Sequence, residues 1–315
     1  MKRALQGAAA LAVAMLMSAC TSFSPRAFRT VAVEGMPAAE IVYRGLSLNS
    51  GVLIVSDAAG ADSLLLSLLG ATYSPFVHSG ILVIENNRPY VYEGFATVDP
   101  FFRGPPTAAM QGGIRRVTLE RYLSRQRIAA IFEPLEHVDR SRIADFAQAR
   151  HRDGTPFDGY FDWNDHSRLY CTEFAALALH AGGLDLPQPV PVRNNPSLRI
   201  ALDWLKVTTP EIVTAETLTP QMHRVALLSR RYSAEQVAAH FAAKQEIHAR
   251  FTADQKIGNI WRWTWRGLAL QPPVAKFLRE SREQPERSTE QLALEFFGAI
   301  DARTVSTHAS PEVLH

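Results

Sequence analysis

Residues 77–95 read VHSGILVIENNRPYVYEGF, a pattern typical of a β-hairpin. Two runs rich in β-formers, 77–84 and 89–95, flank the turn-forming group ENNR at 85–88. Because side chains alternate between the faces of a strand, the position of this turn also decides which residues share a face.

This alternation places a histidine and an acid on the same face of the hairpin. With the turn centred on the two asparagines, His78 pairs opposite Phe95, and Glu93 lies opposite Gly80 on the same face. Diagonal neighbours on one face are within reach of long side chains, and Gly80 leaves room for the contact. Glu93 would then accept a hydrogen bond from one imidazole nitrogen and fix the tautomer. The alternatives are a structural histidine and a solvated strand carboxylate, and a one-residue register slip would separate the two side chains.

The sequence around the hairpin predicts a mixed α+β domain at about 45–205. Strands are expected at 51–55, 116–119 and 128–135, and helices at 62–70, 119–124, 141–150 with Ser141 as N-cap, and from Cys171 to the Gly182-Gly183 pair. From about 206 the chain becomes charge-rich and is expected to be helical, most clearly at 233–251 and 291–300, with interruptions at Pro272-Pro273 and 279–287. The region 206–315 is therefore interpreted as a helical C-terminal extension.

The N-terminus has the pattern of a signal peptide. Lys2 and Arg3 precede an apolar stretch at 8–17 and the small residues before Cys20. This stretch is too short for a bilayer span, which needs roughly 20 apolar residues. Residues 1–19 resemble a bacterial lipoprotein signal, which implies lipidation at Cys20, a tether at 20–44 and an outer-membrane location facing the periplasm. The alternative is simple secretion with an incidental cysteine.

Composition excludes some function classes. The chain has 315 residues, 47% of them hydrophobic, and a formal net charge of +2. It carries neither a basic block interleaved with aromatic residues nor a glycine-lysine phosphate loop, so nucleic acid is not an expected partner. No cofactor is expected either.

Cys171 would be a lone thiol. The chain has only 2 cysteines, and lipidated Cys20 would leave Cys171 unpaired in a compartment that oxidises paired thiols. Cys171 is expected at the start of a helix, where the helix dipole and a nearby imidazolium lower the pKa of a thiol. The alternative is a buried cysteine that behaves as a small hydrophobe.

These motifs resemble a family, the circularly permuted papain-like hydrolases of the YiiX/YaeF type, which are related to NlpC-type cell-wall peptidases. The resemblance rests on His78-Ser79-Gly80, Tyr92-Glu93 and Tyr170-Cys171-Thr172-Glu173, and it spans roughly residues 45–185. It implies a permuted papain-like fold with an antiparallel sheet and a helix that carries the catalytic cysteine. The order of histidine before cysteine is the one that the permuted group requires.

By this resemblance Cys171 is the nucleophile, His78 the general base and Glu93 the orienting residue. The reaction would be acyl transfer through a thioester. The backbone N–H of Cys171 is the expected oxyanion donor, with Tyr160 and Tyr170 as candidate helpers, although either tyrosine could simply pack in the core. The acidic residues at 158, 162 and 165 are expected to cap turns. No ligand spacing supports a metal site.

The run WRWTWR at 261–266 has two interpretations. Its tryptophans could lie at a membrane surface, or they could pack on the catalytic domain.

Three functions stay open from the sequence. The first is a thiol amidase or peptidase that acts on cell-envelope peptides, with peptidoglycan as the natural substrate. The second is a thiol acyltransferase or lipid hydrolase at the membrane, suggested also by the apolar segment Leu64 to Leu69. The third is a non-catalytic envelope scaffold.

Overall fold

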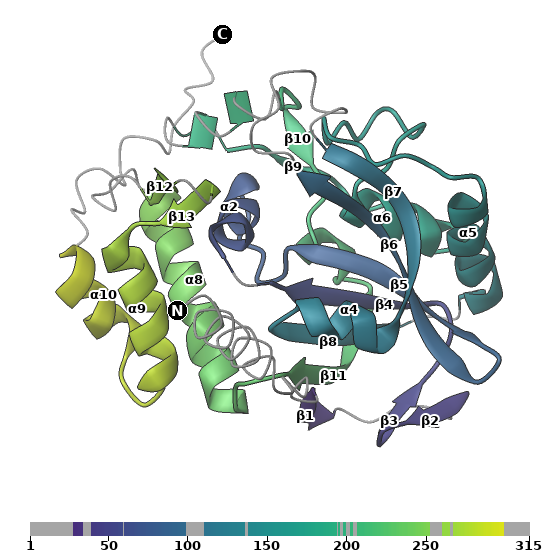
Figure 1. The fold of residues 1–315 in the computed structure, drawn as a ribbon, viewed down its shortest axis with the longest axis horizontal. Coiled ribbons are helices and arrows are strands. Elements are labelled where there is room, and N and C mark those ends of the chain that lie inside the picture. The colour runs from purple at the N-terminus through teal and green to yellow at the C-terminus, as the bar shows by residue number, and fades with distance from the viewer. Residues whose placement is uncertain are drawn as a thin grey trace, which may run out of the picture.

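The computed structural model describes residues 28–33, 39–58, 60–98, 110–135, 138–193, 195, 198–199, 202–203, 207–252, 260–264 and 267–298. Within them, a seven-stranded sheet has the order β1-β11-β8-β4-β5-β6-β7 (Figure 1). All of its neighbouring strands are antiparallel. The strands are β1 (Arg29–Val33), β4 (Val52–Asp57), β5 (His78–Glu85), β6 (Arg88–Val98), β7 (Met110–Thr118), β8 (Ile128–Pro134) and β11 (Met222–Ser229).

Helices and loops cover this sheet on both faces. In β4, Leu53 and Val55 belong to one core cluster, whereas Val52 and Ile54 belong to another. Helices α5 (Arg140–Arg152) and α6 (Cys171–Ala181) pack on the first face, and α4 (Leu119–Arg125) contributes to the core of the second. Burial on both faces explains why β4 is a continuous apolar run rather than an alternating one. The expected α+β class is confirmed.

The β5–β6 hairpin forms in the predicted register. Ile81 pairs with Tyr92 and Glu85 with Arg88, and continuing the register places Gly80 opposite Glu93. The two turn asparagines at 86 and 87 have φ angles of 50° and 60°. This left-handed conformation suits asparagine and joins the strands with the twist that a two-residue hairpin turn needs.

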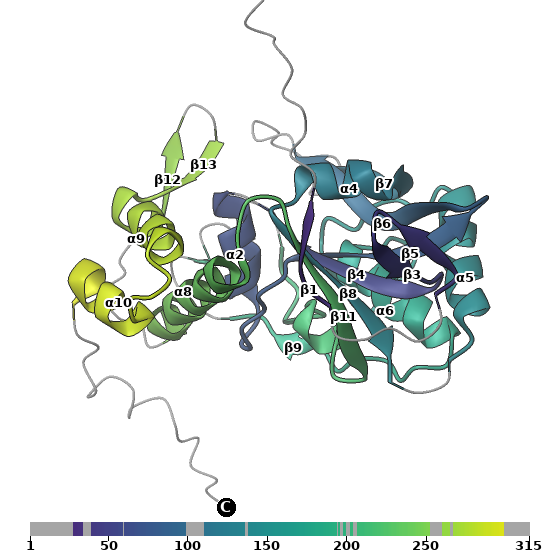
Figure 2. The ribbon, with the colours of Figure 1, turned by 90° about the horizontal axis from the view of Figure 1, so that it is seen from below.

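The C-terminal part forms a helical layer beside the sheet (Figure 2). Helix α8 (Ala234–Thr252) packs against α9 (Pro272–Glu283), α10 (Thr289–Phe297) and α2 (Ala61–Leu69). A short hairpin of β12 (Trp261–Thr264) and β13 (Gly267–Leu270) lies next to α2. Trp261 is buried, its indole N–H donates to the Ala61 carbonyl at 3.2 Å, and its ring contacts Phe251 edge-on. Trp261 therefore packs inside the protein.

Three local features differ from the sequence expectation. Helix α9 begins at Pro272-Pro273, where the helix was expected to be interrupted, because proline is tolerated in the first turn of a helix. The N-cap of α5 is Asp139 rather than Ser141, since its carboxylate accepts from the backbone N–H groups of Ser141 and Arg142. Residues 222–229, expected to be helical with the rest of 206–315, form β11 inside the sheet.

Strand β1, which lies in the stretch expected to be a tether, pairs with β11 at the sheet edge. Smaller elements complete the described fold: β2 (Ile41–Tyr43), β3 (Leu46–Leu48), β9 (Val190–Pro191), β10 (Glu211–Ile212) and the short 3-10 turn η1 (Glu216–Leu218). The signal sequence and Cys20 lie outside the described residues. Among the helices that the structure describes, none combines the length and apolar character that a membrane span requires.

Candidate active site

Cys171 is the first residue of α6, and the helix begins directly against the β5–β6 hairpin. The Ser79 hydroxyl donates to the Cys171 carbonyl at 2.9 Å. A Cβ added to Gly94 would lie 3.1 Å from both the N and the Cα of Cys171. The absence of a side chain at Gly94 thus lets the turn that carries Cys171 approach the strand backbone closely.

His78 and Glu93 form a direct contact on this hairpin. The Nε2 atom of His78 lies 2.5 Å from Oε2 of Glu93, and their side chains are 16% and 0% exposed. The second ring nitrogen, Nδ1, is left for another partner, and the Cys171 side chain lies close enough to the His78 ring to interact with it electrostatically. The three residues predicted as a site are brought together.

Tyr122 holds the imidazole from α4. Its ring stacks on that of His78 with centroids 5.8 Å apart and an interplanar angle of 22°. The Tyr122 hydroxyl shares a 2.8 Å hydrogen bond with the Ser56 hydroxyl. Stacking and this anchored hydroxyl restrict the rotation of the His78 ring.

Two arginines contact the buried carboxylate of Glu93. Nε of Arg115 donates to Oε1 of Glu93 at 2.9 Å, and Arg125 donates to the same oxygen at 2.5 Å. Burial alone raises the pKa of the Glu93 carboxyl, but the contacts with His78 and Arg125 outweigh it and hold the pKa below its ordinary value. A buried carboxylate with three cationic or hydrogen-bonding partners can orient the imidazole without itself becoming protonated.

The site strongly favours the imidazolium form of His78. Burial lowers the pKa of the ring, but the interactions with Cys171 and Glu93 outweigh burial and raise the pKa to about 10. His78 therefore holds a proton near Cys171 at neutral pH. A histidine in this state can donate that proton to a leaving group.

The two tyrosines considered as oxyanion helpers lie in different settings. Tyr170 is buried as the N-cap residue of α6, and its hydroxyl accepts from the Val213 N–H at 3.1 Å. That contact assigns Tyr170 a packing role that ties α6 to the 207–218 segment. Tyr160 is exposed, in a turn where its backbone N–H donates to Asp158 at 2.9 Å.

The acidic loop before α6 builds its own turns. Asp158 accepts from two backbone N–H groups, and Asp162 and Asp165 each accept from the backbone two residues on, as a turn-capping role requires. Glu173 is fully buried beneath this loop and contacts Nδ1 of His166 at 2.7 Å. Burial and the neighbouring aspartates raise the pKa of Glu173 to about 9.

Comparison with known proteins gives one structural likeness. No family model matches the chain, and no curated protein matches it. Among solved structures, the chain is similar to the crystal structure of the metalloprotein YiiX from Escherichia coli O157:H7. The match covers 56% of this chain and 96% of that one, with 18% sequence identity and a TM-score of 0.45. In the described part of the present chain, no three His, Cys, Asp or Glu side chains gather in a way that could hold a metal ion.

Several residues that contact His78, Glu93 and Cys171 could not be predicted from the sequence. Ser79 and Gly94 follow His78 and Glu93 directly in the sequence. Their contacts with Cys171 exist only because α6 packs against the hairpin. Arg115 lies on β7, directly opposite Glu93 on β6. A long connection separates these two strands in the sequence, and local sequence patterns do not specify how the strands pair. Tyr122 and Arg125 come from α4, and nothing in the sequence of that helix marks a link to His78 or Glu93.

Proposed function

We propose that this chain is a thiol hydrolase of the amidase or peptidase type, with Cys171, His78 and Glu93 as its catalytic triad. The observation that carries the proposal is that a thiol at the N-terminus of α6 lies beside the β5–β6 hairpin, which supplies a protonated imidazole and a buried carboxylate. A nucleophile, a base and a group that orients the base are the minimum for this chemistry.

In the first step, Sγ of Cys171 attacks the carbonyl carbon of an amide. The tetrahedral intermediate collapses when the C–N bond breaks, and Nδ1 of His78 gives its proton to the leaving amine. The products of this half-reaction are a thioester on Cys171 and a free amine.

In the second step, water attacks the thioester and gives a proton to Nδ1 of His78. The C–S bond breaks, the acid leaves, and the thiolate–imidazolium pair is restored. Glu93 accepts the Nε2 hydrogen throughout, so that Nδ1 keeps facing the thiol. The backbone N–H of Cys171 is the proposed oxyanion donor.

The order of these residues in the chain supports a permuted papain-like fold. The histidine and acid lie on β5 and β6, ahead of the cysteine helix, as the resemblance to the YiiX/YaeF type implies. That resemblance also suggests cell-envelope peptides, and peptidoglycan stems in particular, as the substrate.

A thiol acyltransferase or lipid hydrolase is the second candidate. The same thioester would form, and the acyl group would pass to another acceptor or come from a lipid. One argument for it is weakened, because Leu64, Leu65, Leu68 and Leu69 are buried in the core and do not form a lipid-facing surface. A non-catalytic scaffold would keep the same geometry without turnover.

The proposal also places the protein in the bacterial envelope, lipid-anchored through Cys20 and facing the periplasm from the outer membrane. Metabolic labelling with a fatty-acid analogue tests the anchor. The wild type should incorporate the label, and Cys20→Ser should lose both the label and the membrane fraction. Equal labelling of the two proteins would contradict lipidation at Cys20.

A thiol-directed acyl probe tests the catalytic proposal. The wild type should be labelled at Cys171, whereas Cys171→Ala should not be labelled and His78→Ala only weakly. No labelling above Cys171→Ala would favour the scaffold. Incubation with muropeptides and, separately, with phospholipids then distinguishes the two enzymes, since a new free amine from muropeptides marks the amidase and a released fatty acid marks the lipid hydrolase.

A further inference from the structure

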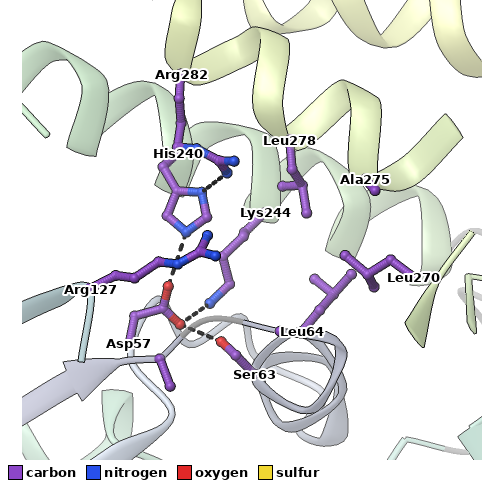
Figure 3. Close-up of a pocket in the computed structure, with 12 residues that line it drawn as sticks. Asp57, Ser63, Leu64, Arg127, His240, Lys244, Leu270, Ala275, Leu278 and Arg282 are labelled. Atoms are coloured by element: carbon purple, nitrogen blue, oxygen red, sulfur yellow. Dashed lines mark hydrogen bonds and ion pairs between the residues drawn. The ribbon is translucent and has the colours of Figure 1, made fainter. Parts of the chain in front are cut away.

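A polar cavity lies between the sheet and the helical layer. Its volume is about 180 Å³, several times the ~30 Å³ that one water molecule occupies in the liquid. The end of β4, the first turn of α2, and helices α8 and α9 supply most of its walls (Figure 3). Its polar side is built around Asp57, and its other side is apolar, with Leu64, Leu270 and Leu278.

Asp57 is already satisfied inside the protein. Its carboxylate accepts from Nζ of Lys244 at 2.7 Å, from the Ser63 hydroxyl at 2.5 Å and from Nε2 of His240 at 3.0 Å. The side chains of Asp57 and Lys244 are only 1% and 2% exposed. These two opposite charges neutralise each other as a buried ion pair.

His240 adds no charge to the cavity. Nη1 of Arg282 lies 3.2 Å from Nδ1 of His240, and a guanidinium can only donate, so Nδ1 must accept. The ring proton is therefore on Nε2, where it is donated to Asp57. Burial lowers the pKa of His240, in agreement with this neutral tautomer.

Two arginines remain without a carboxylate in the cavity. Arg127 lines it from the start of β8, and Arg282 reaches it from α9 (Figure 3). Among the described residues, neither guanidinium forms a salt bridge, and Arg282 contacts only His240 and the ring of Tyr232. Because the Asp57–Lys244 pair is balanced, the cavity carries an excess of two positive charges.

We propose that this cavity binds a phosphate monoester, with Arg127 and Arg282 holding the phosphate and the leucine side accepting the attached carbon group. A phosphate monoester carries nearly two negative charges at neutral pH, which matches the excess. Planar guanidinium groups suit phosphate oxygens because they donate two parallel hydrogen bonds. The first turn of α2 has no side-chain cap and its N-cap residue, Gly60, lines the cavity, so backbone N–H groups also lie at the cavity wall.

This site is separate from the proposed thiol chemistry. None of the three triad residues lines the cavity. The ligand could be a free phosphate monoester or the headgroup of a phosphatidic acid, because both present the same dianion. The binding of either does not require Cys171.

Isothermal titration calorimetry with glycerol 3-phosphate tests the proposal on the full chain. We expect saturable binding by the wild type and by Cys171→Ala, and a loss of affinity of about tenfold or more in Arg127→Gln and in Arg282→Gln. Arg279→Gln is the matched control, because Arg279 lies on the same helix with an exposed side chain and does not line the cavity. It should bind like the wild type.

Vesicle sedimentation identifies the source of the phosphate. Phosphatidylcholine vesicles with and without phosphatidic acid are compared for the wild type and the two arginine variants. Arginine-dependent binding to the phosphatidic acid vesicles indicates a lipid headgroup, whereas arginine-dependent binding of glycerol 3-phosphate alone indicates a soluble ligand. Binding of neither, or binding that survives both arginine substitutions, would overturn the proposal, and it would leave the thiol hydrolase untouched because Cys171 labelling is measured separately.

Discussion

His78 is the residue through which the candidate site works, because its ring contacts Glu93, stacks on Tyr122 and lies within reach of Cys171. A pKa of about 10 keeps the ring protonated across the neutral range. This positive charge next to the Cys171 sulfur should make the sulfur a better nucleophile, because it attracts negative charge there.

Alkylation of Cys171 by iodoacetamide measures this effect. We expect the wild type to react readily at pH 6 to 7, and His78→Gln to react at least about tenfold more slowly there. Peptide mass spectrometry restricts the readout to Cys171. His180→Gln, at the far end of α6, should match the wild type, and identical profiles for His78→Gln and wild type would contradict the pairing.

Glu93 should contribute to stability as well as to orientation. The substitution Glu93→Gln leaves Arg115 and Arg125 without their buried carboxylate and should lower the free energy of unfolding by about 2 to 3 kcal/mol at pH 7. Urea unfolding measures this change. Glu120→Gln is the control, because Glu120 forms an exposed pair with Arg44 and its substitution should cost within about 1 kcal/mol.

The sign of the pH dependence follows from the lowered pKa of Glu93. A depressed folded-state pKa stabilises the protein above the ordinary glutamate value of about 4.3, and this stabilisation is lost as the pH falls through the folded-state pKa. The difference between wild type and Glu93→Gln should therefore shrink in acid. A difference that grows in acid would show that Glu93 is not the ionised partner.

At the level of elements, the close approach of α6 to β6 determines whether the thiol of Cys171 lies next to the imidazole of His78. Gly94→Ala would place a methyl group 3.1 Å from the backbone of Cys171, where no flexible side chain can yield. We expect α6 to shift and the probe labelling of Cys171 to fall by about tenfold or more. Thr97→Ala, at an exposed position on the same strand, is the control, and undiminished labelling of Gly94→Ala would contradict the tight contact.

The elements also show what local sequence can predict. The hairpin register followed from an Asn-Asn turn and strand alternation, which are short-range signals, so the His78–Glu93 contact could be predicted. Strand β11 could not, because its place in the sheet depends on pairing with β8, about a hundred residues away in the chain, and with β1, about two hundred residues away. The start of helix α9 was not predicted, because its N-terminal proline pair was interpreted as an interruption of a helix.

Across the whole molecule, the helical layer is joined to the sheet by buried charge. Lys244 of α8 donates both to Asp57 and to the Pro75 carbonyl, just ahead of His78. The C-terminal region therefore supports the segment that leads into β5. This link could not be predicted from local sequence patterns, since Asp57 and Lys244 are far apart in the chain.

Lys244→Met should therefore destabilise the protein by about 3 kcal/mol or more, because it leaves Asp57 buried beside a neutral histidine. Lys276→Met, which removes an exposed pair with Glu280, should cost less than about 1 kcal/mol. Urea unfolding compares the two. Equal costs would show that the buried pair does not anchor the helical layer.

The covalent intermediate is the most direct test of the catalytic account. Intact-protein mass spectrometry after mixing with an activated acyl ester should show one acyl group on the wild type, mapped to Cys171, which disappears with time as the thioester hydrolyses. Glu93→Gln should form and lose it more slowly, and Cys171→Ala should never acquire it. An acyl group that maps elsewhere, or the same kinetics in Cys171→Ala as in the wild type, would contradict the proposed role of Cys171.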